Sequence, residues 1–176
     1  GIAFHSRKQV KNCIKPSEPD TGIIFKRVDL KENNLIYPNF INVCNTSLNT
    51  TISNNSGVKV STIEHLMGAL FGIGIDNALV EIDNEEVPIL DGSAKVFIEK
   101  ILSSGLKMSD KPIKIIKINK KIKFSDDDRF ISIEPSTLNL DINYEIRYQN
   151  DIIGNQKNSV KVFEDDYNFL WVKEGD

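Results

Sequence analysis

Residues 57–94 constrain the fold most, because extended and helical patterns alternate within them over short distances. A short extended run leads into a helix that carries Glu64 and His65, and glycines interrupt the turn that follows. Ala78–Ile82 reads as an apolar strand, and a turn that ends at Pro88 separates it from a second helix. This succession of short strands and helices predicts an α+β fold.

The first of these helices begins with a sequence that matches a capping box. Ser61 is expected to accept a hydrogen bond from the backbone N–H of Glu64, while the Glu64 side chain reaches back. One face of the helix is apolar and should be buried; its members are Ile63, Leu66, Met67 and Leu70. The neighbouring face carries His65, Gly68 and Ala69, so we expect small residues to leave space beside the imidazole.

Several polar residues of this stretch have simple structural interpretations. Asp91 or Ser93 is a candidate N-cap for the second helix, and Asp91 is most simply a helix cap or a turn residue. Gly105 is a natural end for that helix. Glu85 and Glu86 follow the apolar strand, and we expect both to lie in a solvated turn.

The residues before this stretch are mostly extended. Residues 21–28 form a β-rich run, and residues 35–38 and 42–52 suggest further strands. Residues 54–57 read Asn-Asn-Ser-Gly, which is typical of a hairpin turn. A largely extended N-terminal region is therefore expected to precede the first helix.

The pattern changes after about residue 104, where predicted strands replace the alternation of short strands and helices. Residues 138–148 alternate strictly between apolar and polar side chains, which predicts a half-buried antiparallel strand. The change of pattern near residues 104–112 is the best candidate for a domain boundary. We therefore expect a first domain over residues 1–106 and a second, incomplete domain over residues 107–176.

Composition narrows the possible function classes. The chain has 176 residues, a net charge of −3 and 40% hydrophobic residues, as expected of a soluble globular protein with one or two small domains. The acidic balance argues weakly against nucleic-acid binding, and the basic run over residues 111–123 is expected to be the solvated side of a strand. Only Cys13 and Cys44 are present, which suits a reducing compartment. No apolar run is long enough to span a membrane, so we expect a cytoplasmic protein.

Glu64 and His65 are the one place where a carboxylate adjoins an imidazole. Histidine is a common zinc ligand, and an adjacent glutamate can act as a general base toward water. The structural alternative is that Glu64 caps the helix and His65 is a partly buried polar residue; the two interpretations are compatible. A catalytic zinc needs three protein ligands, and the only other histidine is His5, so no complete site is evident.

Other binding motifs are weak or missing in the sequence. The polar residues 46–51 could bind a sugar or nucleotide through their hydroxyl groups, or could form an edge strand. The sequence contains no Walker loop, no G-x-G-x-x-G and no serine nucleophile elbow. Nucleotide-dependent phosphoryl transfer and serine hydrolase chemistry therefore have no support.

Several ordered segments together carry a resemblance to a known family. Residues 61–66 read STIEHL, residues 72–77 read GIGIDN, residues 88–94 read PILDGSA and residues 1–6 read GIAFHS. With further matches within residues 20–30, they closely resemble the UDP-3-O-acyl-N-acetylglucosamine deacetylases. These enzymes are zinc amidohydrolases of lipid A synthesis in Gram-negative bacteria.

The resemblance implies a fold, a reaction and a set of residues. The fold would be two similar domains, each a sheet layered against two helices, with the active site between them in a monomer. Glu64 would be the general base and His65 one ligand of Zn²⁺, in the release of acetate from a UDP-3-O-acyl-N-acetylglucosamine substrate. The family positions that would contact this substrate are Thr46, Leu48, His5 and Asp91.

This sequence also departs from the family pattern. Ala3 and Arg7 stand where the family has glycines, and residues 169–176 no longer match. The family's other zinc ligands, in an H-K-x-x-D helix, and its general-acid histidine are not in this chain. We therefore expect an N-terminal portion that is inactive alone. The alternatives are a non-catalytic α+β remnant or interaction domain, and a fragment that assembles with a separate C-terminal piece.

Overall fold

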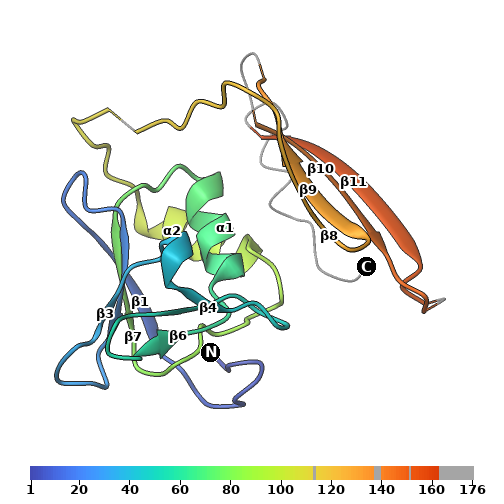
Figure 1. Cartoon of the computed structure of the whole chain (residues 1–176). Coiled ribbons are helices and arrows are strands. Elements are labelled where there is room, and N and C mark those ends of the chain that lie inside the picture. The colour runs from blue at the N-terminus through green and yellow to red at the C-terminus, as the bar shows by residue number, and fades with distance from the viewer. Residues whose placement is uncertain (113, 137–139, 151, 163–176) are drawn as a thin grey trace. The chain divides into compact units, whose positions relative to one another are not determined.

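The computed structural model describes residues 1–112, 114–136, 140–150 and 152–162 (Figure 1). The chain divides into two compact units, Gly1–Pro112 and a second unit to which the described residues after Pro112 belong. Within the described residues, α-helices occur in the first unit and strands in both units, so the predicted α+β fold is confirmed. Among the described residues, no helix has the length and apolar character needed to cross a bilayer. The divergent residues 169–176 lie outside the described part.

A four-stranded sheet forms one layer of the first unit. Its strands are β1 (Asn12–Pro16), β2 (Ile23–Arg27), β3 (Leu35–Ile36) and β7 (Ala78–Ile82), in the spatial order β1-β7-β2-β3. Strand β7 is antiparallel to β1 and parallel to β2, where Phe25 pairs with Val80. Both of these side chains are fully buried, so the core of the unit lies against the central strands.

A smaller antiparallel sheet precedes the first helix. It contains β4 (Val43–Asn45), β5 (Thr51–Ser53) and β6 (Lys59–Val60), and the short helix η1 (Phe40–Asn42) leads into it. The predicted hairpin turn joins β5 to β6: the Asn54 N–H donates to the Val58 carbonyl at 3.0 Å. Gly57 has a φ of +76°, a conformation that glycine adopts without steric cost.

Two helices lie side by side in the first unit (Figure 1). They are α1 (Glu64–Gly72) and α2 (Lys95–Ser104). Leu66 and Leu70 of α1 are fully buried, as the apolar face predicts, whereas Met67 is half-buried. Gly105 ends α2 with a φ of +85°, as predicted.

The predicted capping box at the start of α1 is wrong. The N-cap position is Ile63, and no side chain makes a capping hydrogen bond there. Ser61 instead pairs with the segment after β7: its N–H and its hydroxyl donate to the Glu85 carbonyl at 2.8 and 3.2 Å. Ser61 thus bonds to a residue distant in the sequence and not to Glu64. The local sequence pattern does not encode this distant partner.

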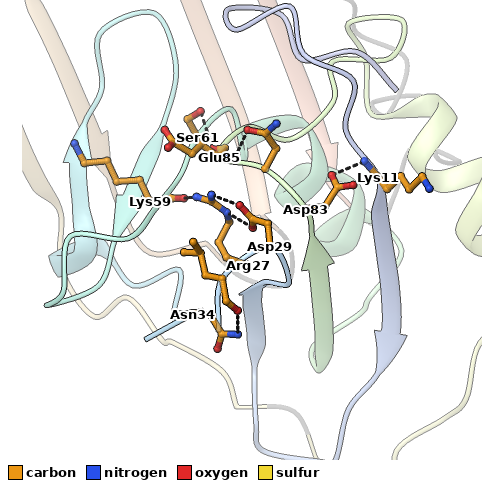
Figure 2. Close-up of polar contacts among 10 residues, drawn as sticks. Lys11, Arg27, Asp29, Asn34, Lys59, Ser61, Asp83 and Glu85 are labelled. Carbon is orange, nitrogen blue, oxygen red and sulfur yellow. Dashed lines mark hydrogen bonds and ion pairs between the residues drawn. The ribbon is translucent and has the colours of Figure 1, made fainter. Parts of the chain in front are cut away.

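Arg27, at the end of β2, is a buried cation that joins the two sheets of the first unit (Figure 2). Its guanidinium donates to both carboxylate oxygens of Asp29, at 2.8 and 2.6 Å, and to the Lys59 carbonyl on β6 at 3.0 Å. Hydrogen bonding and charge from Arg27 hold the pKa of Asp29 below its usual value of 3.8. Planar, forked recognition of this kind is specific to arginine.

We predict that Arg27→Lys lowers the free energy of unfolding by about 2 kcal/mol, because a lysine cannot satisfy Asp29 and Lys59 together. The pKa of Asp29 is lowered in the folded state, so its ionised carboxylate stabilises the fold fully at pH values above the unfolded-state pKa. This stabilisation is lost as the pH falls through the folded-state pKa. Urea unfolding of both proteins at pH 7 and near pH 3 should show a smaller difference at low pH; equal stabilities at pH 7 would contradict the prediction.

The second unit contains two antiparallel hairpins, β8 (Ile122–Asp126) with β9 (Arg129–Ile133) and β10 (Leu140–Arg147) with β11 (Asn155–Val162). Strand β10 confirms most of the strand predicted over residues 138–148, of which 138 and 139 lie outside the described residues. The basic run was expected along a strand, but residues 114–121 are irregular. The strand was predicted to be half-buried, but every residue of β10 is exposed, including Ile142 and Tyr144, so that part of the prediction is wrong. The other described side chains of this unit are exposed or half-buried.

We predict that the apolar face of β10 promotes self-association, because exposed apolar ladders on short sheets attract other chains. In sedimentation velocity, the double variant Ile142→Thr/Ile146→Thr should self-associate less with rising concentration than the unmodified chain. The control variant, Asn143→Thr/Glu145→Thr, places the same β-branched residue on the opposite face. Association that is insensitive to the first pair would contradict the prediction.

Candidate functional site

A pocket of about 240 Å³ lies in the first unit at the start of α1. Its lining comes from the N-terminal loop, the loop between β4 and β5, the segment between β6 and α1, the start of α1, and the segment before α2. The lining residues are Phe4, His5, Leu48, Thr62, Glu64, His65, Ile89 and Gly92. Four of the predicted site residues therefore meet in one place, although up to sixty positions separate them in the sequence.

Glu64 and His65 are the first two residues of α1, and both are half-buried in the pocket wall. The Glu64 carboxylate accepts a hydrogen bond from the Thr50 N–H at 3.1 Å, so it is held toward the β4–β5 loop and not toward its own helix end. One turn along α1, a Cβ on Gly68 would meet nothing within 4 Å. Gly68 is exposed, whereas Ala69 on the same face is fully buried, so this face of the helix is open at Gly68 and packed at Ala69.

The β4–β5 loop brings Leu48 to the pocket, as a lining residue. Its φ is +65° and its side chain is 89% exposed, a combination that presents an apolar group to solvent at the pocket edge. Thr46 is exposed on the same loop but does not line the pocket. Of the polar residues 46–51, only Thr51 belongs to a strand, so the edge-strand interpretation is wrong for most of them.

The N-terminal loop brings His5 to the pocket lining. Its ring stands edge-on to Phe4 with centroids 5.1 Å apart, and the Arg7 guanidinium lies 5.6 Å from the Phe4 ring centre. Ala3 is fully buried, and Arg7 has a φ of +57°, a conformation that favours glycine. The loop thus forms although neither residue is the glycine of the family pattern.

Asp91 lies next to the pocket but does not line it. Its carboxylate accepts from the Ser93 N–H at 3.0 Å and from the Ser93 hydroxyl at 2.9 Å, so it is a turn residue and not a helix cap. The adjoining Gly92, with a φ of +82°, contributes to the lining. Asp91 therefore shapes the turn that brings Gly92 to the pocket.

Glu86 is the residue that the sequence interpretation placed wrongly. Glu85 is exposed, as expected of a solvated turn, but Glu86 is only 2% exposed. Burial raises the pKa of its carboxyl, yet hydrogen bonds from His5 and Ser6, together with the charge of His5, outweigh this and hold the pKa below its usual value of 4.5. The one signal in the sequence is that apolar residues follow Glu86 directly, which is unusual for a solvated turn.

The residues that the structure describes do not by themselves fit a zinc ion. No group of three His, Cys, Asp or Glu side chains in this part of the chain could hold a metal. His65 could provide one nitrogen ligand, and Cys13 and Cys44 are exposed and free. A catalytic zinc site takes three protein ligands, so the pocket could supply at most part of one.

Comparison with known proteins identifies the relatives of this chain. A family described as LpxC: UDP-3-O-acyl N-acetylglycosamine deacetylase matches residues 1–170. Proteins named UDP-3-O-acyl-N-acetylglucosamine deacetylase are 41% identical in Nautilia profundicola, over 89% of this chain and 52% of the relative, and 40% identical in Geobacter sp. strain M21, over 95% and 54%. The chain spans about half the length of these curated relatives. It belongs to the UDP-3-O-acyl-N-acetylglucosamine deacetylase family.

Proposed function

We propose that this chain is the N-terminal portion of a zinc-dependent deacetylase. The substrate would be UDP-3-O-acyl-N-acetylglucosamine, and the reaction would belong to lipid A synthesis in the cytoplasm of a Gram-negative bacterium. The observation that carries the proposal is the pocket in which Glu64 and His65 meet His5 and Leu48. The family match supports the reaction class, and the relatives' names support the substrate.

Glu64 is proposed as the general base. Its carboxylate lines the pocket, and the Thr50 N–H fixes its direction without using both oxygens. In hydrolysis of the 2-acetamido group, a water oxygen adds to the amide carbonyl while Glu64 takes a proton from that water. The C–N bond then breaks, the nitrogen gains a proton, and acetate and a free amine are released.

His65 is proposed as one ligand of the zinc ion, and the remaining ligands would come from outside the described residues. Leu48 and His5 line the pocket and are proposed to contact the substrate; Thr46 and Asp91 lie next to it and are proposed as outer contacts. An exposed leucine beside polar groups suits a substrate that joins a sugar to an acyl chain. We propose that the enzyme acts as a monomer.

The second candidate function is a non-catalytic α+β remnant or interaction domain. One observation favours it: the residues that the structure describes contain no group of three side chains that could hold a metal ion. In that case, substituting Glu64 or His65 would change the stability of the protein no more than substituting another half-buried polar residue, and would affect no turnover. Turnover and metal content distinguish the two candidates.

We predict that the 176-residue chain alone releases no acetate from UDP-3-O-acyl-N-acetylglucosamine. Joined to the remaining C-terminal part of the Nautilia profundicola relative, it should release acetate in a zinc-containing assay. In the joined protein, Glu64→Gln should lower kcat by a factor of about 100 or more, because the base is lost while shape is kept. Glu85→Gln, which changes an exposed glutamate outside the pocket, is the matched control. Full activity of the Glu64 variant would overturn the role of Glu64.

We also predict that His65→Ala removes the tightly held zinc of the joined protein. Because each ligand of a three-ligand site is needed to retain the metal, zinc per protein after dialysis should fall from about one toward zero. The control is Cys44→Ala, which removes an exposed thiol that could bind zinc adventitiously. Undiminished zinc in the His65 variant would favour the non-catalytic alternative.

A further inference from the structure

Glu86 is the one buried carboxylate in the part of the chain that the structure describes. It does not line the pocket, and the general-base chemistry proposed above does not use it. An ionised carboxylate is costly to bury unless hydrogen bonds compensate for the lost water. The partners that hold Glu86 therefore indicate what it does.

Those partners come from two walls of the pocket. One carboxylate oxygen accepts from the His5 N–H at 2.8 Å and the other from the Ser6 N–H at 2.9 Å. The Thr62 hydroxyl donates to the first oxygen at 3.3 Å. The carboxylate thus binds two successive backbone groups of the N-terminal loop and the residue two positions before Glu64.

Backbone pairing holds Glu86 itself in place. The Ser61 N–H donates to the Glu85 carbonyl at 2.8 Å, and the Val87 N–H donates to the Ser61 carbonyl at 3.0 Å. On the other side, the Ile89 N–H donates to the Ile2 carbonyl at 3.1 Å. The backbone of Glu86 is therefore held on both sides, and its side chain reaches the loop tip from a fixed position.

We propose that Glu86 is a positioning residue that holds the His5 loop against the pocket. His5 reaches the pocket from a loop tip, and its N–H and that of Ser6 both end on this one carboxylate. Charge-assisted hydrogen bonds to two successive N–H groups restrict the backbone that carries the imidazole. The importance of His5 for a substrate rests on the proposed function, whereas the anchoring of its loop does not.

The test is NMR hydrogen exchange on the isotopically labelled 176-residue chain. In Glu86→Gln one acceptor oxygen becomes an NH₂ donor, which cannot accept from a backbone N–H. The one amide, of His5 or Ser6, that then faces the NH₂ group should exchange at least about 10-fold faster, since its hydrogen bond to a charged group is lost. The imidazole proton shifts of His5 should also change as its edge-on contact with Phe4 loosens. Glu85→Gln should leave all of these signals unchanged.

Unchanged exchange at both amides in a folded Glu86→Gln protein would overturn the proposal. If that variant does not fold, the unmodified chain provides the test. The Arg7 N–H, in the same loop, is bonded to the Ala3 carbonyl at 3.1 Å and serves as an internal standard. His5 and Ser6 should exchange within about 10-fold of Arg7, and unprotected rates at both would overturn the proposal. No turnover is measured, so this outcome is independent of acetate release.

Discussion

The segment from Glu85 to Ile89 is the constraint on which the pocket depends. It pairs with Ser61 on one side and with Ile2 on the other, so it joins the start of α1 to the N-terminal loop. Ile89 of this segment lines the pocket, and the two stretches that the segment joins supply Phe4, His5, Thr62, Glu64 and His65. The segment therefore connects the two stretches that bring Glu64 and His5 to one pocket.

Local patterns in the sequence predicted the elements well and their partners poorly. Three elements were predicted correctly because they depend on residues close together in the sequence. The strand at Ala78–Ile82 follows from its apolar run, and the hairpin turn at residues 54–57 and the helix end at Gly105 follow from glycine conformations. The capping role of Ser61 failed for the opposite reason. Its partner, the Glu85 carbonyl, lies 24 positions away, and only the tertiary fold brings it close.

Glu86 shows the same limit at the candidate site. By residue type it belongs in a solvated turn, and its neighbour Glu85 is indeed exposed. Burial of Glu86 depends on two N–H groups about 80 positions away, a contact that no periodicity encodes. Glu64 and His65 were found because they adjoin and because the surrounding segments resemble a family. The same resemblance named His5 and Leu48, which the residues alone did not single out, and the structure places both of them in the lining of the pocket.

A titration with UDP-3-O-acyl-N-acetylglucosamine, followed by NMR on the labelled chain, tests most directly whether this pocket is the substrate site. We expect the signals of His5, Leu48 and His65 to shift together in a single saturable process. The first unit also contains a second pocket, lined by asparagines that include Asn33 and Asn54, which serves as the contrast. Shifts confined to those asparagines, with the three pocket residues unchanged, would contradict the assignment.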